Sequence, residues 1–491
     1  MRSRTTALAC GLIMTVALGA APAAAAKRAP RADRAVLQQR LAAAAHGLSG
    51  HAAPRAGRNT SLVGALGLPG GLHGDVWSHR GTAYVGTWSG PCPGTGVKII
   101  DASNPASPRQ IATAGAYPNT SAEDMQVAAV ATSSFSGDLL AIGLQDCGLP
   151  DTAPGRTGVD LWDVTDPAEP THLGFFDTGS GGTHEVSLTV RRIAGQQRVF
   201  ALAAVPFAEV FSTLFTDTPR GDFQLVDVTD PAAPVLADDW GAGKDGGLPF
   251  GAPFLSDFGP PFDCTPPGGG ASPCRGHFPS VFNHSASPSS DGMTAYLAYW
   301  DIGAVVLDMT DPSDLQFVGR TIYPMPSEGD THSAMPNAAG TLLATTDEDF
   351  SPAERKAAGE PKLLGDTWGF ARLWGLSDPS DPEHLSDVTT PHSLTGKTDA
   401  FYSAHNPEFV GDTLSVSWYS DGVRFFDVSD PRRPVETGFY RPHPTLDPTG
   451  VFAAFGAGDH PIAFVWGVHN DAGLTYLSDI NYGLYIIRRE Q

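Results

Sequence analysis

A short apolar phrase recurs along the chain, and each full copy ends in a polar turn. The copy VDLWDVTDPAEP shows the plan: mostly apolar residues, then Asp, then Ser or Thr, then Asp-Pro or a close variant. The Asp and Ser/Thr side chains can hydrogen-bond the turn backbone, and Pro ends a strand. Full copies occupy residues 97–108, 159–170, 223–234, 304–315, 371–382 and 423–434, and a truncated copy occupies 483–490. Copies at intervals of roughly 50 to 80 residues indicate one supersecondary unit per copy.

Each copy lies within the same order of apolar segments. An inner segment and a short apolar strand, such as TAYLAYW, precede the phrase, and a further strand, such as VETGFYR, follows it. Four strands per unit is the plan of a propeller blade. The seventh copy stops after its third strand, and residues 61–66 (SLVGAL) resemble the missing fourth. The pattern therefore predicts an all-β, seven-bladed β-propeller over residues 59–491, closed by an N-terminal strand that pairs with the last blade.

Composition agrees with many short strands. The chain is 41% hydrophobic and 17% charged, with 56 Gly and 42 Pro, which disfavours coiled coils and helical bundles. The recurring phrase resembles that of the LVIVD repeat family, whose copies run like LxIVDVSDPxxP, and the resemblance covers nearly all of 61–490. This resemblance implies a propeller, often an exported one, and implies little about activity.

Charge narrows the range of partners. The chain has 31 Lys and Arg against 53 Asp and Glu, a formal net charge of −22. Such a surface repels nucleic acid and anionic lipid, so neither is expected as a partner. A small molecule or a cell-surface ligand stays open. Beyond the N-terminus no apolar run is long enough to span a membrane, and a closed ring with an acidic surface favours a monomer.

The N-terminus has the pattern of a secretory signal. Arg2 and Arg4 precede an apolar run at residues 7–20, and small residues follow at 21–26. We expect residues 1–26 to be a signal peptide cleaved after export through the Sec pathway, which makes the protein secreted. Residues 27–58 are expected to be a basic, Ala-rich, flexible leader.

Four cysteines follow the signal segment, and an even number in an exported chain suggests two disulfides. Three pairings are possible. Cys92 and Cys147 fall in equivalent second-to-third-strand loops of adjacent blades, and Cys264 and Cys274 lie close together in one loop rich in Pro and Gly. We therefore expect the pairs Cys92–Cys147 and Cys264–Cys274.

Histidines recur where the innermost strand of each blade begins. Five of the seven blades place His at one aligned position, the second blade has Glu123 there, and the first has His73 offset by one residue with Asp75 nearby. The five histidines are His184, His284, His332, His405 and His469. Innermost strands line the central channel, so these side chains should form a ring at one end of it. Neutral imidazoles that converge with a carboxylate are ligands for a transition metal, here copper, iron or zinc. Alternatively, the histidines are residues of the ancestral repeat that only bond neighbouring turns.

Long insertions fall on the face that carries these histidines. Residues 206–221, 240–283, 346–369 and 441–466 connect second to third strands or neighbouring blades, so they should form a rim over the histidine end. Within this rim the run Asp347-Glu348-Asp349 is expected to be a solvated acidic turn, with cation binding as the alternative. The aromatic residues Phe282, Tyr402 and Trp466 are expected to pack between blades, with the lining of a substrate pocket as the alternative.

Three functions are compatible with this pattern. The first is a metal site at the channel mouth; if catalytic, it would be a metal-dependent oxidoreductase or hydrolase that activates dioxygen or water. The second is a non-catalytic propeller that binds a cell surface, a protein or a glycan through its loops. The third is a protein that sequesters metal. No nucleophile elbow, P-loop or HExxH motif is present, so no catalytic residue is assigned.

Overall fold

The computed structural model describes most of the chain after the leader. It covers residues 56–490, apart from 70–71, 89–91, 93, 149–151, 180, 217, 249–280, 324–328, 351, 354–366, 395–396 and 448–459. The expected signal peptide, most of the expected leader and the expected Cys264–Cys274 pair lie outside the described residues.

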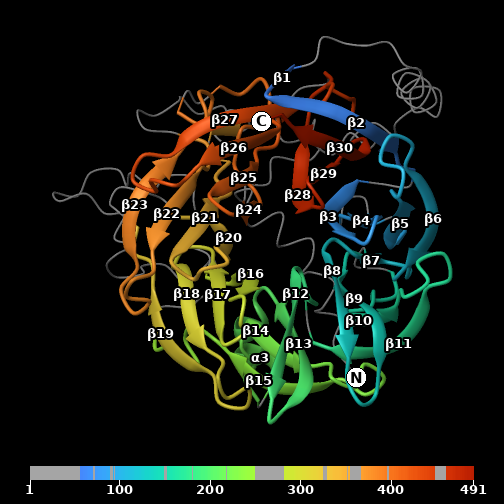
Figure 1. The fold of residues 1–491 in the computed structure, drawn as a ribbon. Helices are drawn as coiled ribbons and strands as arrows, with labels where there is room; N and C mark the ends of the chain where they lie inside the picture. Colours follow the sequence, from blue (N-terminus) through green and yellow to red (C-terminus); the bar gives the residue numbers. More distant parts are fainter. Residues whose placement is uncertain are drawn as a thin grey trace, which may run out of the picture.

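Seven antiparallel sheets surround a central channel, which confirms the seven-bladed propeller (Figure 1). We number the blades in chain order by their innermost strands, from β3 in blade 1 to β28 in blade 7. The strands are β1 (Ala56–Arg58), β2 (Thr60–Gly67), β3 (His73–His79), β4 (Thr82–Thr87), β5 (Val97–Asp101), β6 (Arg109–Ala114), β7 (Thr120–Ser121), β8 (Met125–Ala131), β9 (Ser136–Asp146), β10 (Gly158–Asp163), β11 (Thr171–Asp177), β12 (Val186–Ile193), β13 (Gln196–Ala204), β14 (Phe223–Asp227), β15 (Val235–Trp240), β16 (Asn283–Pro288), β17 (Thr294–Tyr299), β18 (Gly303–Asp308), β19 (Gln316–Arg320), β20 (Thr331–Pro336), β21 (Leu342–Asp347), β22 (Ala371–Gly375), β23 (Glu383–Val388), β24 (Pro407–Val410), β25 (Thr413–Ser417), β26 (Val423–Asp427), β27 (Val435–Arg441), β28 (Val465–Asp471), β29 (Leu474–Asp479) and β30 (Gly483–Arg489).

The ring closes as the sequence predicts. Strand β2 pairs antiparallel with β30, with Leu66 opposite Leu484, and supplies the outer strand of blade 7 (Figure 1). Strand β1 pairs with β27 of blade 6, although its residues were assigned to the leader. There Arg58 Nη2 donates to Glu436 Oε1 at 2.8 Å. The N-terminal segment therefore joins two blades, because it adds an outer strand to each.

Each pair of neighbouring blades shares its own hydrophobic cluster. One example joins blades 3 and 4 through Leu202, Leu225, Leu297 and Val305, all fully buried. The repeated turns hold the other end of each phrase: Asp163 Oδ1 accepts hydrogen bonds from both the backbone and the hydroxyl of Thr165, at 2.9 and 2.6 Å. The recurring phrase thus serves blade packing and turn geometry.

The long connections leave the ring where the sequence predicts. One of them, between β13 and β14, contains the helix α3 (Ala208–Phe215). Within the described part of the chain, no helix has the length and apolarity needed to cross a membrane.

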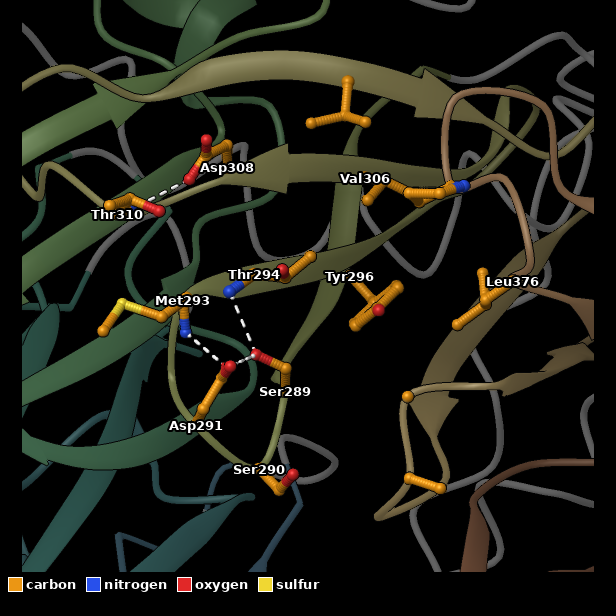
Figure 2. Close-up of a pocket in the computed structure, with 14 residues that line it drawn as sticks. Ser289, Ser290, Asp291, Met293, Thr294, Tyr296, Val306, Asp308, Thr310 and Leu376 are labelled. Carbon is orange, nitrogen blue, oxygen red and sulfur yellow. Dashed lines mark hydrogen bonds between the residues drawn. The ribbon is translucent and has the colours of Figure 1, made fainter.

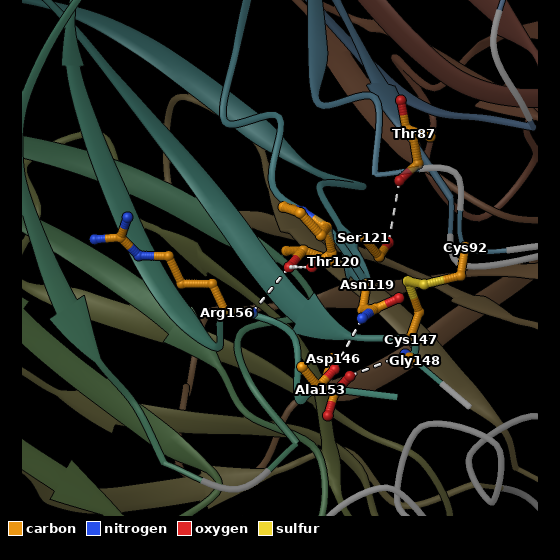
Figure 3. Close-up of a disulfide and its surroundings, with 11 residues drawn as sticks. Thr87, Cys92, Asn119, Thr120, Ser121, Asp146, Cys147, Gly148, Ala153 and Arg156 are labelled. Carbon is orange, nitrogen blue, oxygen red and sulfur yellow. Dashed lines mark hydrogen bonds between the residues drawn. A yellow bond between two sulfur atoms is a disulfide. The ribbon is translucent and has the colours of Figure 1, made fainter. Parts of the chain in front are cut away.

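A disulfide joins Cys92 to Cys147 and confirms that predicted pair (Figure 3). The cysteines lie in the β4–β5 and β9–β10 connections of blades 1 and 2, and their Cα atoms are 5.4 Å apart. Beside them, Ser121 Oγ donates to the Thr87 carbonyl at 3.0 Å, which ties the same two blades together (Figure 3).

Candidate metal site at the channel mouth

Strand register defines one equivalent position in every blade. In blade 4, Val305 of the recurring phrase pairs with Leu297, which pairs with Ala286 of the innermost strand, and His284 lies two residues before Ala286. The same steps in the other blades lead to the channel positions Gly74, Glu123, His184, His332, His405 and Trp466. We call these seven residues the upper row.

Four of the predicted histidines lie side by side in the upper row. Ring centroids are 4.4 Å apart for His184 and His284, and 3.9 Å apart for both His284–His332 and His332–His405. His184 Nε2 lies 2.9 Å from His284 Nε2. The repeat architecture has therefore turned four residues far apart in sequence into one continuous run of imidazoles.

The structure corrects the placement of His469. Trp466 occupies its expected position, with its ring centroid 4.5 Å from that of His405, and His469 lies three residues further along β28. There His469 stacks on Trp77 at 3.9 Å, and its Nδ1 lies 3.1 Å from Glu408 Oε1. Trp466 therefore belongs to the channel rather than to packing between blades alone.

Glu123 closes the run of side chains between Trp466 and His184. Its Oε1 accepts a hydrogen bond from Trp466 Nε1 at 3.1 Å, and its Oε2 lies 3.3 Å from His184 Nδ1. Blade 1 contributes only Gly74 here, where a Cβ atom would lie 2.6 Å from the Glu123 carbonyl oxygen. His73, offset in the sequence, turns away instead, and its Nε2 bonds the Leu68 carbonyl at 3.2 Å.

Two carboxylates that the sequence did not assign complete the geometry. Ligand atoms of His184, Glu185 and His284 lie within 4.8 Å of one another, and so do those of His284, His332 and Glu348. Glu185 directly follows His184 in sequence, a signal that was available. Glu348 belongs to the run expected to be a solvated turn, and that expectation is wrong because its side chain is only 12% exposed.

Burial sets the charge states of these groups. It lowers the pKa of His184 to about 4 and the pKa values of His284, His332 and His405 well below their usual range. Burial, reinforced by neighbouring carboxylates, raises the pKa of Glu123 and Glu185 well above normal. Burial also raises the pKa of Glu348 to about 8. The imidazoles are therefore uncharged at neutral pH and each keeps one nitrogen lone pair, while burial destabilises the negative forms of the acids.

Aromatic side chains from the rim cover this end of the channel. Tyr419 packs 5.1 Å from His405 and donates its hydroxyl to Glu348 Oε1. On the other side Phe282 stacks on Trp300, whose ring lies 5.3 Å from that of His284. Tyr402, expected between blades, stacks on His392 at 4.4 Å instead. The cover keeps the imidazoles dry, which strengthens their interaction with any charge placed among them.

Another cavity lies away from the channel mouth. It holds about 410 Å³ between blades 4 and 5, lined in part by turns at the strand ends opposite the histidines (Figure 2). Its polar groups serve the turns: Asp291 Oδ1 accepts from Ser289 Oγ at 2.6 Å and from Met293 N at 2.9 Å. Ser289 Oγ in turn accepts from Thr294 N at 3.0 Å. These bonds tie the polar groups to the turns, whereas ligand atoms converge at the channel mouth, which is therefore the better candidate site.

Comparison with known proteins supports the repeat. The LVIVD repeat model matches residues 71–113 and 292–322, which lie mainly in blades 1 and 4. No curated protein matches the chain. The computationally designed Ika8 protein is similar at 8% identity and a TM-score of 0.45, over 87% of this chain and 98% of that one. The β-propeller domain of Cps50 (Swd1) from Myceliophteria thermophila gives 10% identity and a TM-score of 0.46, over 87% and 99%.

Proposed function

We propose that this protein is an exported β-propeller that binds a transition metal ion at the channel mouth. His284 is the shared nitrogen ligand, joined by His184 and Glu185 in one group or by His332 and Glu348 in the other. The observation that carries the proposal is the convergence of ligand atoms within 4.8 Å in two overlapping groups that share His284. His405 and Glu123 flank these groups in the upper row and are the alternative ligands.

The spacing of the imidazoles supports this proposal. Metal–nitrogen bonds of about 2.0 to 2.1 Å place two nitrogen ligands about 2.9 Å apart at right angles and about 3.3 Å apart in tetrahedral geometry. His184 Nε2 and His284 Nε2 are 2.9 Å apart, which is also the length of a hydrogen bond between them. Neither ring nitrogen of His405 has a hydrogen-bond partner of standard geometry among the described residues. Such nitrogens cost free energy when buried, and a cation would use their lone pairs.

The ligand types restrict the ion. Imidazole nitrogen with one or two carboxylates suits copper, iron and zinc, and it suits calcium and magnesium poorly. An ion held by three protein ligands keeps an open position and can activate water or dioxygen. A metal-dependent hydrolase or oxidoreductase is therefore the reaction class to assay once the ion is known.

The test is elemental analysis of the full chain, exported and purified without a histidine tag. We expect about one equivalent of copper, iron or zinc, since a buried preformed site binds such ions tightly. His284→Ala should lose it, because His284 belongs to both groups of converging ligands. His284→Gln, which keeps more of the side-chain volume, guards against a loss caused by unfolding alone.

His469→Gln is the matched control. It removes one buried channel histidine, stacked on Trp77 away from the converging ligands, and should leave the metal content unchanged. Circular dichroism should show a folded ring in all variants. The proposal fails if wild-type protein takes up none of the three metals on titration, or if His284→Ala and His284→Gln retain them.

A further inference from the structure

A second polar row lies one residue deeper in the channel. Each of its members directly follows an upper-row residue on the innermost strand, and together they line a cavity of about 120 Å³. The polar members are Asp75, Asp124, Glu185, Ser285, Ser333 and Asn406, and we call them the lower row. Every polar side-chain atom they offer is oxygen apart from the Asn406 nitrogen, whereas the upper row is rich in nitrogen.

The carboxyl groups of the lower row have no cationic Lys or Arg side chain beside them among the described residues. Three of its six members are carboxylates, and none of the described residues that line the cavity is Lys or Arg. Asn406 Nδ2 donates to Asp75 Oδ1 at 2.6 Å, and Asp124 accepts from the backbone of Met125 and Val186, both at 2.7 Å. These bonds orient the two carboxylates without neutralising them, because their donors are uncharged.

The hydroxyl of Ser285 is the independent sign of a ligand. Ser285 is only 3% exposed and lines the same cavity, yet its Oγ has no hydrogen-bond partner among the described residues. The equivalent hydroxyl in blade 5, Ser333 Oγ, donates to Asn406 Oδ1 at 2.8 Å. A buried hydroxyl without a partner costs free energy, so an atom that Ser285 can bond is expected inside the cavity.

We infer that the lower row is a second, separate cation site, for a hard divalent cation such as Ca²⁺. Calcium takes six to eight oxygen ligands from carboxylates, amide or hydroxyl oxygens and waters, which is the chemistry this row offers. Among the described residues, the three carboxylates do not form together one of the groups whose ligand atoms converge within 4.8 Å. The ion is therefore held partly through water, with Asp75 and Asp124 supplying charge and Ser285 a neutral oxygen.

Terbium luminescence tests this inference on the full chain after treatment with a chelator. Tb³⁺ replaces Ca²⁺ in oxygen sites, and Trp77, which lines the cavity, is in place to sensitise its emission. Wild-type protein should give saturable emission that Ca²⁺ reverses. Asp75→Asn should weaken Tb³⁺ binding about tenfold or more, because it removes a ligand charge.

Ser285→Ala separates a ligand from a structural role. Because Ser285 Oγ makes no hydrogen bond to the described residues, its removal should leave the thermal stability of the ion-free protein unchanged while weakening Tb³⁺ binding about threefold or more. Asp427→Asn is the charge control: its carboxylate caps an exposed repeat turn by accepting from Ser429 N at 2.9 Å, and binding should not change. Wild-type Tb³⁺ affinity in both Asp75→Asn and Ser285→Ala would overturn the site.

His284→Ala distinguishes this site from the one proposed above. It should lose zinc, copper or iron and keep Tb³⁺ binding. Loss of Tb³⁺ binding together with the transition metal would overturn a separate lower site. If the protein binds Tb³⁺ but takes up no transition metal, the proposed upper site is wrong and the lower site is supported.

Discussion

Two arcs of the same channel carry opposite chemistry. Blades 3 to 6 present four imidazoles in the upper row, which we call the imidazole arc: His184, His284, His332 and His405. Blades 1 to 3 present four acids in the two rows, which we call the carboxylate arc: Asp75, Glu123, Asp124 and Glu185. Backbone and register are shared, so the difference comes from side chains alone. A ring of repeats can thus build an asymmetric site without any change of fold.

The two arcs meet at blade 3, where His184 and Glu185 are consecutive. Glu185 follows His184 directly, so an oxygen ligand and a nitrogen ligand are consecutive in sequence. This arrangement lets two kinds of ion bind in the two neighbouring rows. The carboxylate arc also holds the features that the imidazole arc lacks in the described chain: a glycine in the upper row and an interblade disulfide.

Removing the disulfide should have the largest effect on stability. Cys92 and Cys147 are 55 residues apart, and a loop of that length corresponds to about 4 kcal/mol of lost chain entropy in the unfolded state. Replacement of both by Ser should lower the free energy of unfolding by about that amount, measured by denaturant titration. The circular dichroism spectrum should stay that of the folded ring. A fully unfolded variant at 25 °C would contradict a disulfide that only joins rim loops.

Replacement of Gly74, the glycine of the upper row, should have the second largest effect on the free energy of unfolding. In Gly74→Ala the new Cβ would lie 2.6 Å from the Glu123 carbonyl oxygen and 2.9 Å from its Cγ. We expect a loss of about 3 kcal/mol in unfolding free energy, because the carboxylate arc must shift. Gly375→Ala, whose nearest atom would be Leu385 Cδ2 at 3.5 Å, is the control and should change stability by less than about 1 kcal/mol. Equal losses would mean that the crowding at Glu123 is unimportant.

The junction between the arcs depends on Trp466. Trp466→Phe removes the indole that donates to Glu123 Oε1 at 3.1 Å and leaves a buried carboxyl without that bond. We expect a destabilisation of about 2 kcal/mol in thermal unfolding. Trp77→Phe is a matched comparison, since Trp77 Nε1 has no hydrogen-bond partner among the described residues, and should cost less. A larger cost for Trp77→Phe would show that packing, not the bond to Glu123, dominates.

The smallest expected effect is the pH dependence of the unfolding free energy that arises from Lys98 in blade 1. Burial lowers the pKa of Lys98 to about 8. Between pH 8 and the usual lysine pKa the folded protein binds fewer protons than the unfolded chain, so stability should rise with pH. Relative to Lys98→Met, wild-type unfolding free energy should increase by about 1 kcal/mol per pH unit between pH 8 and 10. Parallel pH profiles for the two proteins would contradict a buried, charged Lys98.

Register explains what the sequence predicted well and what it did not. Four histidines aligned correctly because each lies two residues before the same paired position of the innermost strand. His469 was misaligned because it lies three residues after the equivalent position of β28, which Trp466 occupies. The sequence alone does not say which of these residues faces the upper row. A slip along a strand changes which face and which level of the channel a side chain occupies.

Glu348 was missed for a different reason. An acidic run after a strand is solvated in most turns, and only the rim segments that fold over the channel bury this one. Its neighbour Asp347 is 3% exposed and pairs with Arg372 across the sheet. No local pattern distinguishes such a carboxylate from an exposed one, because burial depends on distant loops.

The sequence by itself determined the repeat, the number of blades, the closing strand, the Cys92–Cys147 pair and the gathering of histidines at one end of the channel. Each follows from local periodicity or from the equivalence of positions in successive repeats, and both can be found in the sequence itself. Only the tertiary structure decided which imidazoles are neighbours, that Trp466 replaces His469, and that Glu185 and Glu348 join the site. These outcomes depend on hydrogen-bond register and on burial by segments far apart in sequence, and both arise only when the ring closes.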